Sequence, residues 1–504
     1  MSLGRKQLRL LAATAFLSVA LAAWQAAPQG QTNATAFTGA RVIVGDGRAP
    51  LEHATIVVTG NRITQVGTNV AVPAGATRVD LTGKTVMPAI IDTHVHTSQT
   101  TEALTQDLQR RAYYGVGAVM SMGQDANDPP FQMRAQTPPG LARFFTAGRG
   151  ITMPEPGRTT APYWVQTPAE VQKAVSELAA KKVDIVKIWV DDRNGTVQKM
   201  TPEIYRAVID EAHKHKLRVA AHIFNLTDAK GLLRAGLDAF AHGVRDVDVD
   251  DEFMALVKQH PNLVLGPNLP DRGVKVDTSW LKASLPAAEY AKLEEGNTDR
   301  PQAQQAFAIQ ARNLAKMNAA GVKIVLGSDG NTPWAPHVEM ADMVAAGMTP
   351  MQVIVAATRN GAEYIRIPDT GTLEANKSAD FLVLDANPLD DITNTRRISA
   401  VYLRGQAYRW EVTADLASGD VTAPGPDDPA ARFVVVSLEV VTRVADQGSR
   451  IGSDDPLSLG ILLAREGLLV DAAHSLDRAA SRGSESDRAI ARSLLAQLAA
   501  TMRR

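Results

Sequence analysis

The sequence predicts an α/β protein built around a (β/α)8 TIM-like barrel. Short apolar runs alternate with helical patterns over the middle of the chain, and eight such runs can be counted. Polar side chains that suit a metal ion follow several of these runs, and catalytic groups of such barrels lie at the carboxyl ends of the strands. A doubly wound open sheet is the alternative arrangement of the same elements.

The barrel is expected over residues 86–370. Its strands are expected at Val86–His96, Ala118–Met122, Arg143–Ala147, Val183–Val190, Arg218–Phe224, Ala239–His242, Leu263–Gly266 and Lys323–Gly327. Helical patterns between most of them cover Glu102–Tyr114, Pro168–Lys181, Pro202–His215, Thr227–Ala235, Glu252–His260 and Gln302–Ala319. Long connections follow the third and seventh strands, on the face where loops commonly shape or close a pocket: Gly148–Thr167 and Pro267–Arg300.

Segments on both flanks of the barrel have the pattern of short strands separated by turns. Residues 36–85 and 371–411 are therefore predicted to build one composite β-sandwich domain. Residues 412–429 are expected to be a linker, because Pro, Gly and Asp dominate them, and a helical extension is expected over 430–504. Its first helical segment has the spacing of a single tetratricopeptide repeat, and an amphipathic hairpin resting on the main body is the alternative. These helices are the candidate contact for a second copy of the chain or for a protein partner.

The first 30 residues have the pattern of an export signal peptide. Basic residues at Arg5, Lys6 and Arg9 precede an apolar run that ends near Ala23, and small residues follow. The run is too short to favour a stable membrane span, which needs about 20 residues, although an uncleaved anchor is the alternative. The mature protein is expected to be periplasmic or secreted, with no stable membrane span after cleavage.

The composition excludes several classes of partner and site. The chain has 504 residues, a formal net charge of −1 and no cysteine. A balanced charge gives no reason to expect nucleic acid or an anionic membrane as a partner. Without cysteine, a metal ion must be held by His, by carboxylate or by an unusual ligand. The sequence also has no phosphate-binding loop, dinucleotide fingerprint or serine nucleophile elbow.

The strongest single motif is the stretch VMPAIIDTHVHT at residues 86–97. A continuous apolar run ends in His94 and His96. Alternate residues of a strand share a face, so these two imidazoles point the same way and can bind one metal ion. The alternative is a pair of ordinary polar residues where a strand reaches the surface.

Four further positions at strand ends complete a constellation. Lys187 lies in the apolar strand DIVKIWV, where an unpaired ammonium is costly. A buried lysine has a lowered pKa, and a neutral amine can add carbon dioxide to give a carbamate that bridges two metals. His222, His242 and Asp329 each end a predicted strand. Taken singly, Lys187 would pair with Asp191 or Asp192, the histidines would be ordinary core residues, and Asp329 would be a turn residue.

Together these six residues resemble the metal site of the amidohydrolase superfamily. The resemblance covers roughly residues 36–411, and it is nearest to imidazolonepropionase-like proteins and prolidase-type dipeptidases with a carbamylated lysine. It implies that one divalent metal is bound by His94, His96 and Asp329. It implies that a second is bound by His222 and His242, with carbamylated Lys187 and a hydroxide bridging the two. The ligand types suit zinc, and Asp329 would act as the general base and then the general acid.

The expected function is cleavage of a C–N amide bond in a small substrate, such as an N-acyl amino acid or a dipeptide-like molecule. Arg245 is a candidate clamp for a substrate carboxylate, with an ion pair to Asp246 or Asp248 as the alternative. His337 is a second candidate substrate residue, with a helix cap as the alternative. Prolidase-type relatives suggest a tyrosine soon after the fifth-strand histidine, but Ile223, Phe224 and Asn225 follow His222 here. A cyclic-amide hydrolase, a lactone or phosphoester hydrolase and a non-catalytic metal-binding scaffold therefore stay open.

Overall fold

The computed structural model describes residues 34–157, 159–282, 284–411, 432–436, 455–465, 475–476, 479–481 and 485–502. The predicted signal peptide, the predicted linker and part of the predicted helical extension lie outside these ranges. In the described part of the chain, no helix combines the length and the apolar character needed to cross a membrane.

One antiparallel-rich sheet of nine strands is built from both flanks of the chain. Its spatial order is β19-β18-β17-β16-β5-β1-β2-β3, and β4 pairs with β1. The early strands are β1 (Ala34–Val42), β2 (Leu51–Thr59), β3 (Arg62–Gly67), β4 (Thr77–Asp80) and β5 (Thr85–Pro88). The late strands are β16 (Phe381–Leu384), β17 (Ile398–Leu403), β18 (Gln406–Glu411) and β19 (Arg432–Val436). The two groups meet where β5 pairs antiparallel with β16, and the buried rings of Phe37, Phe381 and Tyr402 pack beside this junction.

Two predictions for this sheet were wrong. Val86–His96 is not one strand: β5 ends at Pro88 in the nine-stranded sheet, and β6 (Ile90–Val95) begins a different sheet after Ala89. The extension over 430–504 is not wholly helical, because β19 pairs antiparallel with β18. Its described helices are α14 (Pro456–Arg465) and α16 (Glu485–Met502).

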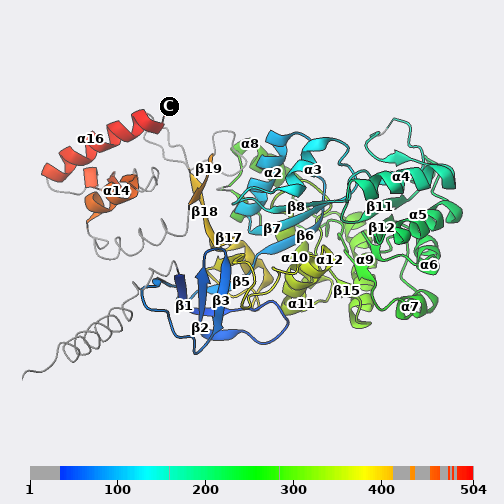
Figure 1. Ribbon diagram of the computed structural model, residues 1–504, viewed down its shortest axis with the longest axis horizontal. Helices are drawn as coiled ribbons and strands as arrows, with labels where there is room; N and C mark the ends of the chain where they lie inside the picture. The colour runs from blue at the N-terminus through cyan, green and yellow to red at the C-terminus, as the bar shows by residue number, and fades with distance from the viewer. Residues whose placement is uncertain are drawn as a thin grey trace, which may run out of the picture.

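The remaining strands are parallel and carry the helices on their outside (Figure 1). A three-stranded sheet contains β6, β7 (Val116–Ser121) and β8 (Arg143–Thr146). A seven-stranded sheet follows the order β10-β9-β11-β12-β13-β14-β15, with β9 (Ile151–Thr152), β10 (Tyr163–Trp164), β11 (Val186–Val190), β12 (Val219–Ile223), β13 (Ala239–Phe240), β14 (Val264–Leu265) and β15 (Lys323–Ile324). This alternation of parallel strands and helices is the TIM-like α/β fold that the sequence predicts.

Backbone hydrogen bonds connect these two sheets at both sides. The N–H of Thr93 donates to the Leu326 carbonyl at 2.9 Å, beyond the end of β15. On the other side, the N–H of Asp184 donates to the Thr146 carbonyl at 3.0 Å. The ends of β6 and of the β15 segment therefore lie together, which brings the residues that follow them into one site.

The helices lie between the strands along the chain, and several of them begin at a capping side chain. They are α2 (Thr101–Tyr113), α3 (Asp128–Ala135), α4 (Pro168–Ala180), α5 (Pro202–Lys214), α6 (Leu226–Arg234), α7 (Asp251–Lys258), α8 (Ala287–Gly296), α9 (Pro301–Ala319), α10 (Ala335–Ala345), α11 (Pro350–Val355) and α12 (Gly361–Tyr364). Thr167 and Glu170 form a capping box before α4, and Pro168 occupies its first turn. In α5, the buried residues Ile204, Val208 and Ala212 repeat every four positions and face the strands.

Candidate metal centre

The carboxyl end of β6 supplies the first two imidazoles of the site. Every residue of β6 is buried, so a polar side chain on this strand needs a partner. The Nδ1 of His94 lies 3.2 Å from Asn268 Oδ1 and 3.3 Å from the Ala241 carbonyl oxygen. These acceptors hold the proton on Nδ1, which leaves the Nε2 lone pair of His94 free for a metal ion. The ring of His96 lies close by, with the two ring centres 5.3 Å apart.

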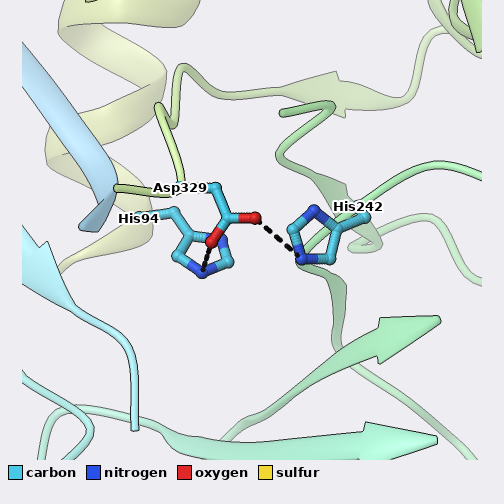
Figure 2. A group of neighbouring side chains, drawn as sticks. All are labelled: His94, His242 and Asp329. Carbon is cyan, nitrogen blue, oxygen red and sulfur yellow. Dashed lines mark ion pairs between the residues drawn. The ribbon is translucent and has the colours of Figure 1, made fainter. Parts of the chain in front are cut away.

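Asp329 lies opposite these imidazoles. Its Oδ1 is 3.1 Å from His94 Nε2 and 3.0 Å from His96 Nε2. Its Oδ2 is 3.5 Å from His242 Nε2 (Figure 2). Burial raises the pKa of Asp329, but the neighbouring imidazoles of His94, His96 and His242 outweigh burial and hold that pKa well below its usual range. The carboxyl group is therefore an anion at neutral pH.

The backbone of Asp329 is held in an unusual conformation. Its φ of +51° is uncommon for a non-glycine residue, and such conformations persist where the surroundings enforce them. Asp92 is part of that enforcement, because its carboxylate accepts from the N–H of Ser328 at 3.0 Å and from the hydroxyl of Ser328 at 2.6 Å. Fully buried Arg111 lies 3.4 Å from Asp92 and donates to the Gly330 carbonyl at 2.9 Å. These contacts fix the loop on both sides of Asp329.

His222 on β12 and His242 after β13 complete the cluster of imidazoles. His242 is almost fully buried, and its ring centre lies 4.6 Å from that of His222 and 5.1 Å from that of His94. Burial lowers the pKa of His94 and of His222 to about 4, and it lowers that of His242 strongly as well. These imidazoles are neutral at pH 7, which is the form that binds a metal.

Lys187 is fully buried on β11 and lies beside the same cluster. Burial lowers the pKa of its amine to about 7, with Asp329 opposing this shift and Arg245 and Arg193 adding to it. Among the described residues, its Nζ has no hydrogen-bond partner. The alternative pairing with Asp191 or Asp192 is wrong, because Asp191 binds His222 and Asp192 faces Lys199.

Two glycines make room for the Lys187 side chain and its neighbour Trp189. A Cβ at Gly150 would lie 2.1 Å from the Trp189 ring, and one at Gly123 would lie 2.6 Å from it. A Cβ at Gly123 would also lie 3.0 Å from Lys187 Cγ. The loops after β7 and β8 can therefore approach β11 closely only because these positions are glycine.

Arg245, which was predicted as a substrate residue, interacts electrostatically with the site but is not among the residues that line its cavity. The alternative ion pairs with Asp246 and Asp248 are wrong, because Asp246 accepts from the N–H of Leu226 and Asp248 pairs with Arg312. Burial lowers the pKa of Arg245, and the charges that act on its guanidinium most strongly are those of Asp329 and Asp191. The Arg245 guanidinium therefore lies within electrostatic range of the centre.

A second guanidinium lies at the site without any motif to signal it. Arg193 Nη1 is 2.9 Å from Asp191 Oδ2 and 3.4 Å from His222 Nε2. Asp191 Oδ2 in turn lies 3.0 Å from His222 Nε2, so this carboxylate orients the imidazole. Neither residue stood out in the sequence, because one Asp and one Arg in a loop after a strand have many ordinary roles.

The open part of the site is a cavity of about 180 Å³. It is lined by His96, His222, His242 and Asp329 from the centre, by Trp189 and Arg193 from the β11 side, and by Gln124, Thr152, Glu155, Thr159 and Pro162 from the loops after β7 and β8. The predicted long connection after the third strand thus lines the cavity, as expected for a loop on the catalytic face.

His337 was predicted as a substrate residue, and this prediction was wrong. The residue lies in the first turn of α10 with only 1% of its surface exposed. Its Nδ1 lies 3.0 Å from Thr395 Oγ1, and its Nε2 lies 2.9 Å from the Tyr114 carbonyl oxygen. Both ring nitrogens are occupied inside the protein, so His337 has a structural role.

The residues present suit a metal ion. Ligand atoms of His94, His242 and Asp329 all lie within 4.8 Å of one another, which one small cation can span. In the described residues, the Nδ1 of His242 and the Nζ of Lys187 are buried without a hydrogen-bond partner, which is costly unless something binds there. Neutral imidazoles and a carboxylate are the ligands that zinc and similar divalent ions prefer when no thiolate is available.

Comparison with known proteins agrees with this chemistry. Residues 85–408 match the amidohydrolase family, which is more than half of the chain. The chain belongs to the amidohydrolase family. Hydrolases that act on C–N bonds are among the relatives of this chain, which supports hydrolase activity.

Three relatives of this amidohydrolase illustrate its range. The imidazolonepropionase of Deinococcus radiodurans is 25% identical over 382 residues, which cover 70% of this chain and 92% of that protein. The ochratoxinase of Aspergillus niger is 25% identical over 287 residues, which cover 52% of this chain and 54% of that protein. The crystal structure of a Bifidobacterium longum protein described as a prolidase superposes with a TM-score of 0.61 at 27% identity, covering 74% of this chain and 94% of that one.

Proposed function

We propose that this amidohydrolase is an exported, metal-dependent enzyme that cleaves the C–N amide bond of a small N-acyl amino acid or dipeptide-like substrate. One observation carries the proposal: His94, His242 and Asp329 form a single group of ligand atoms beside the buried, unpartnered Lys187. Family membership supports hydrolysis, and the geometry supports the metal requirement.

Two divalent ions, with zinc as the first candidate, are the cofactors of this proposal. His94, His96 and Asp329 would hold one of them, and His222 and His242 would hold the other. When bound, such ions polarise a substrate carbonyl and can lower the pKa of bound water to about 7. Asp191 and Asn268 would orient the imidazoles of His222 and His94 from behind.

Lys187 is proposed to carry a carbamate. Its amine is buried and has a pKa of about 7, so a substantial part of it is in the neutral form that adds carbon dioxide near neutral pH. The carbamate would add the negative charge that this part of the site lacks, since Arg193 and Arg245 both act on Lys187 as cations.

Asp329 is proposed to move the proton. Its carboxylate is an anion held against three imidazoles, so it can accept a proton from the attacking water and deliver it to the leaving nitrogen. Arg245 would bind the substrate carboxylate, and its buried Nε, which has no partner among the described residues, supports this role.

A cyclic-amide hydrolase is the second candidate. The similarity to imidazolonepropionases favours it, as does the absence of a tyrosine in Ile223-Phe224-Asn225 after His222. A lactone or phosphoester hydrolase would use the same metal centre. A non-catalytic metal-binding scaffold would have no need to keep residues able to bind at all six ligand positions.

Three further proposals concern the rest of the chain. Export to the periplasm or the medium rests on the basic and apolar pattern of residues 1–30. Closure of the parallel strands into an eight-stranded barrel rests on the hydrogen bonds that join the β6 and β15 segments. Contact with a second copy or a protein partner through the C-terminal helices rests on exposed Ile461 and Ile490.

A substrate screen tests the proposed function. Purified protein is loaded with zinc, its metal content is measured, and it is assayed against dipeptides, N-acyl amino acids, cyclic amides, lactones and phosphoesters. The proposal expects turnover of acyclic amides and a rise in KM for Arg245→Met with substrates that carry a carboxylate. Turnover of cyclic amides alone would establish the second candidate, and absence of turnover in every class with metal bound would leave the scaffold.

A further inference from the structure

A second, larger cavity lies beside the metal centre, between the long connection after β14 and helix α10. It measures about 420 Å³, against about 180 Å³ for the cavity at the metal centre. Ligand cavities commonly measure about 300–1,000 Å³, so this one has room for a sizeable chemical group. None of the six predicted metal ligands is among its lining residues.

The inner end of this cavity adjoins the metal centre through two pairs of neighbouring residues. Ser328 lines the larger cavity, and the next residue, Asp329, lines the smaller one. Leu269 also lines the larger cavity, and the preceding residue, Asn268, lies 3.2 Å from His94. The walls of the two cavities therefore contain neighbouring residues on both of these loops.

The lining combines aromatic and aliphatic side chains. The indoles of Trp280 and Trp334 line the cavity, together with Val274 and Val338, which are 37% and 38% exposed. The guanidinium of Arg396 lies 4.8 Å from the centre of the Trp280 ring, which makes this part of the wall a flat stack. Flat walls of this kind favour flat apolar groups, because aromatic rings pack best on other planar surfaces.

Charged side chains also line the cavity. Four of them are basic and four are acidic, but burial raises the pKa of Glu339 well above its usual range and that of Asp342 to about 7. Within the wall, Arg272 Nε pairs with Asp342 Oδ1 at 2.7 Å, and Arg300 pairs with Asp271. These pairs occupy two of the four basic side chains, and a third, Arg396, lies over the Trp280 ring, so the indoles and valines offer much of the remaining surface to an incoming group.

Polar contacts across the inner end hold the two walls together. The N–H of Leu269 donates to both carboxylate oxygens of Glu339 at 3.1 Å, and Arg272 pairs with Asp342 on the same helix. These contacts join the connection after β14 to α10. The cavity is therefore formed in advance, which lowers the entropic cost of filling it.

We propose that this cavity is the subsite for a flat aromatic group of the substrate. The inference rests on the proposed amide hydrolysis and deepens it: the substrate class becomes amides with an aromatic ring system on the acyl or the amine side. The metal centre would act on the amide, and Trp280 and Trp334 would bind the ring.

Two substrate series and two variants test this subsite. One series is glycine acylated with acetyl, benzoyl or 2-naphthoyl groups; the other is N-acetylglycine, N-acetylphenylalanine and N-acetyl-naphthylalanine. Val338→Trp places an indole in the cavity mouth. Ala345→Trp is the matched control, because Ala345 is exposed on the same helix and does not line the cavity. If Val338→Trp fails to fold, Val274→Trp in the facing wall replaces it.

The expected result is that kcat/KM rises with ring size in at least one series. Val338→Trp should lower the ratio of kcat/KM for the naphthyl substrate to kcat/KM for the smallest substrate by about tenfold or more. Such a loss is expected when a group no longer fits its pocket. Ala345→Trp should leave that ratio at the wild-type value. A ratio unchanged in Val338→Trp, or preference of the wild type for the smallest member of both series, would overturn the subsite and leave amide hydrolysis standing.

Direct binding separates this proposal from the proposed function. Binding of N-(2-naphthoyl)glycine to the zinc-loaded protein is measured by calorimetry. Binding that is lost only in Val338→Trp, without hydrolysis of any amide, would support the subsite and overturn the function. Equal binding by all three proteins would overturn the subsite.

Discussion

The backbone N–H of Asp329 donates to the carbonyl oxygen of His94 at 2.7 Å, and its carboxylate Oδ1 lies 3.1 Å from His94 Nε2. The two residues are thus joined through both backbone and side chain, although 234 residues lie between them in the sequence. The backbone link fixes where the carboxylate stands relative to the imidazole, so a change of side chain at Asp329 need not move the loop.

Asp329→Asn should therefore separate metal binding from proton transfer. Asparagine tolerates the positive φ at this position, and its amide oxygen can still coordinate, but it cannot accept a proton at neutral pH. We expect metal content to be largely kept and kcat to fall by roughly 10²–10⁴-fold. Metal analysis and steady-state kinetics check this, and near-normal turnover with the metals in place would remove Asp329 from the proton shuttle.

Lys187→Ala should lower metal content and abolish turnover, because the carbamate needs the amine. Short carboxylates such as acetate should restore part of the activity by entering the space of the lost side chain. Lys173→Ala is the control, since Lys173 is exposed on α4 and is not one of the proposed ligands. Two tightly bound metals and full turnover in Lys187→Ala would contradict the binuclear assignment.

Asp191→Ala should weaken metal binding without removing a ligand. Asp191 holds both His222 Nε2 and Arg193 Nη1, so its loss frees an imidazole to rotate. Loss of such an orienting carboxylate typically costs about 10–100-fold in metal affinity. Competition with a chelator measures this, and Asp192→Ala is the control, because Asp192 contacts the N–H of Gly195 rather than the imidazole. Equal chelator resistance in the two variants would show that Asp191 does not orient His222.

The pH dependence of stability should contain a contribution from His337. Burial lowers its pKa to about 4, against an opposing hydrogen bond to the Tyr114 carbonyl, whereas an unfolded histidine titrates near 6.5. The unfolded state therefore binds a proton first as the pH falls. The contribution is fully present above pH 6.5 and is lost between 6.5 and about 4, by roughly 3 kcal/mol in total.

Urea unfolding of chelator-treated protein across this pH range measures the effect. The buried imidazoles of the metal centre act with the same sign, so the informative quantity is the difference between wild type and His337→Gln. The variant should lose less stability on acidification. Parallel curves for the two proteins would show that the His337 pKa is close to the unfolded value.

Truncation after Val436 should leave a folded, metal-binding hydrolase. Truncation near Ala423 would also remove β19 and leave β18 as an unpaired edge strand, which promotes association. Light scattering, metal content and turnover of the two truncated proteins check this. Lost catalysis in the longer one, with folding and metal preserved, would show that the tail contributes to the active site.

The order of strands and helices was predictable because apolar periodicity reports burial directly. The break at Ala89 was not, since residues on both sides of it are buried and a continuous apolar run looks the same whether it lies in one sheet or two. β19 was missed for a related reason: its pairing with β18 is a property of two segments and not of either one alone.

In the site, the candidate metal ligands were predictable from the sequence, whereas the residues that hold them in position were not. His94, His222, His242 and Lys187 stand out because imidazole and ammonium groups are unusual at the ends of buried strands. Asp92 and Asp191 are ordinary carboxylates whose roles depend on neighbours from other strands. His337 was wrongly predicted to be a substrate residue for the same reason. Thr395 and Tyr114, whose oxygens lie within hydrogen-bond distance of its two ring nitrogens, are far from it in sequence.

The pairing of β5 with β16 also constrains how the chain is made. Pro88 lies opposite Phe381, so the sheet begun by the first strands is completed only after the whole intervening segment has been synthesised. Until then, the edge of β5 has no partner strand, and the apolar side chains of β1 to β5 that later pack against β16 and β17 are exposed. Pairing across so long a stretch is slow, and a waiting edge of this kind invites association with other chains. Chaperones that bind nascent chains should therefore raise the folding yield during this interval. The finished protein no longer needs them, because its β5 edge is paired with β16.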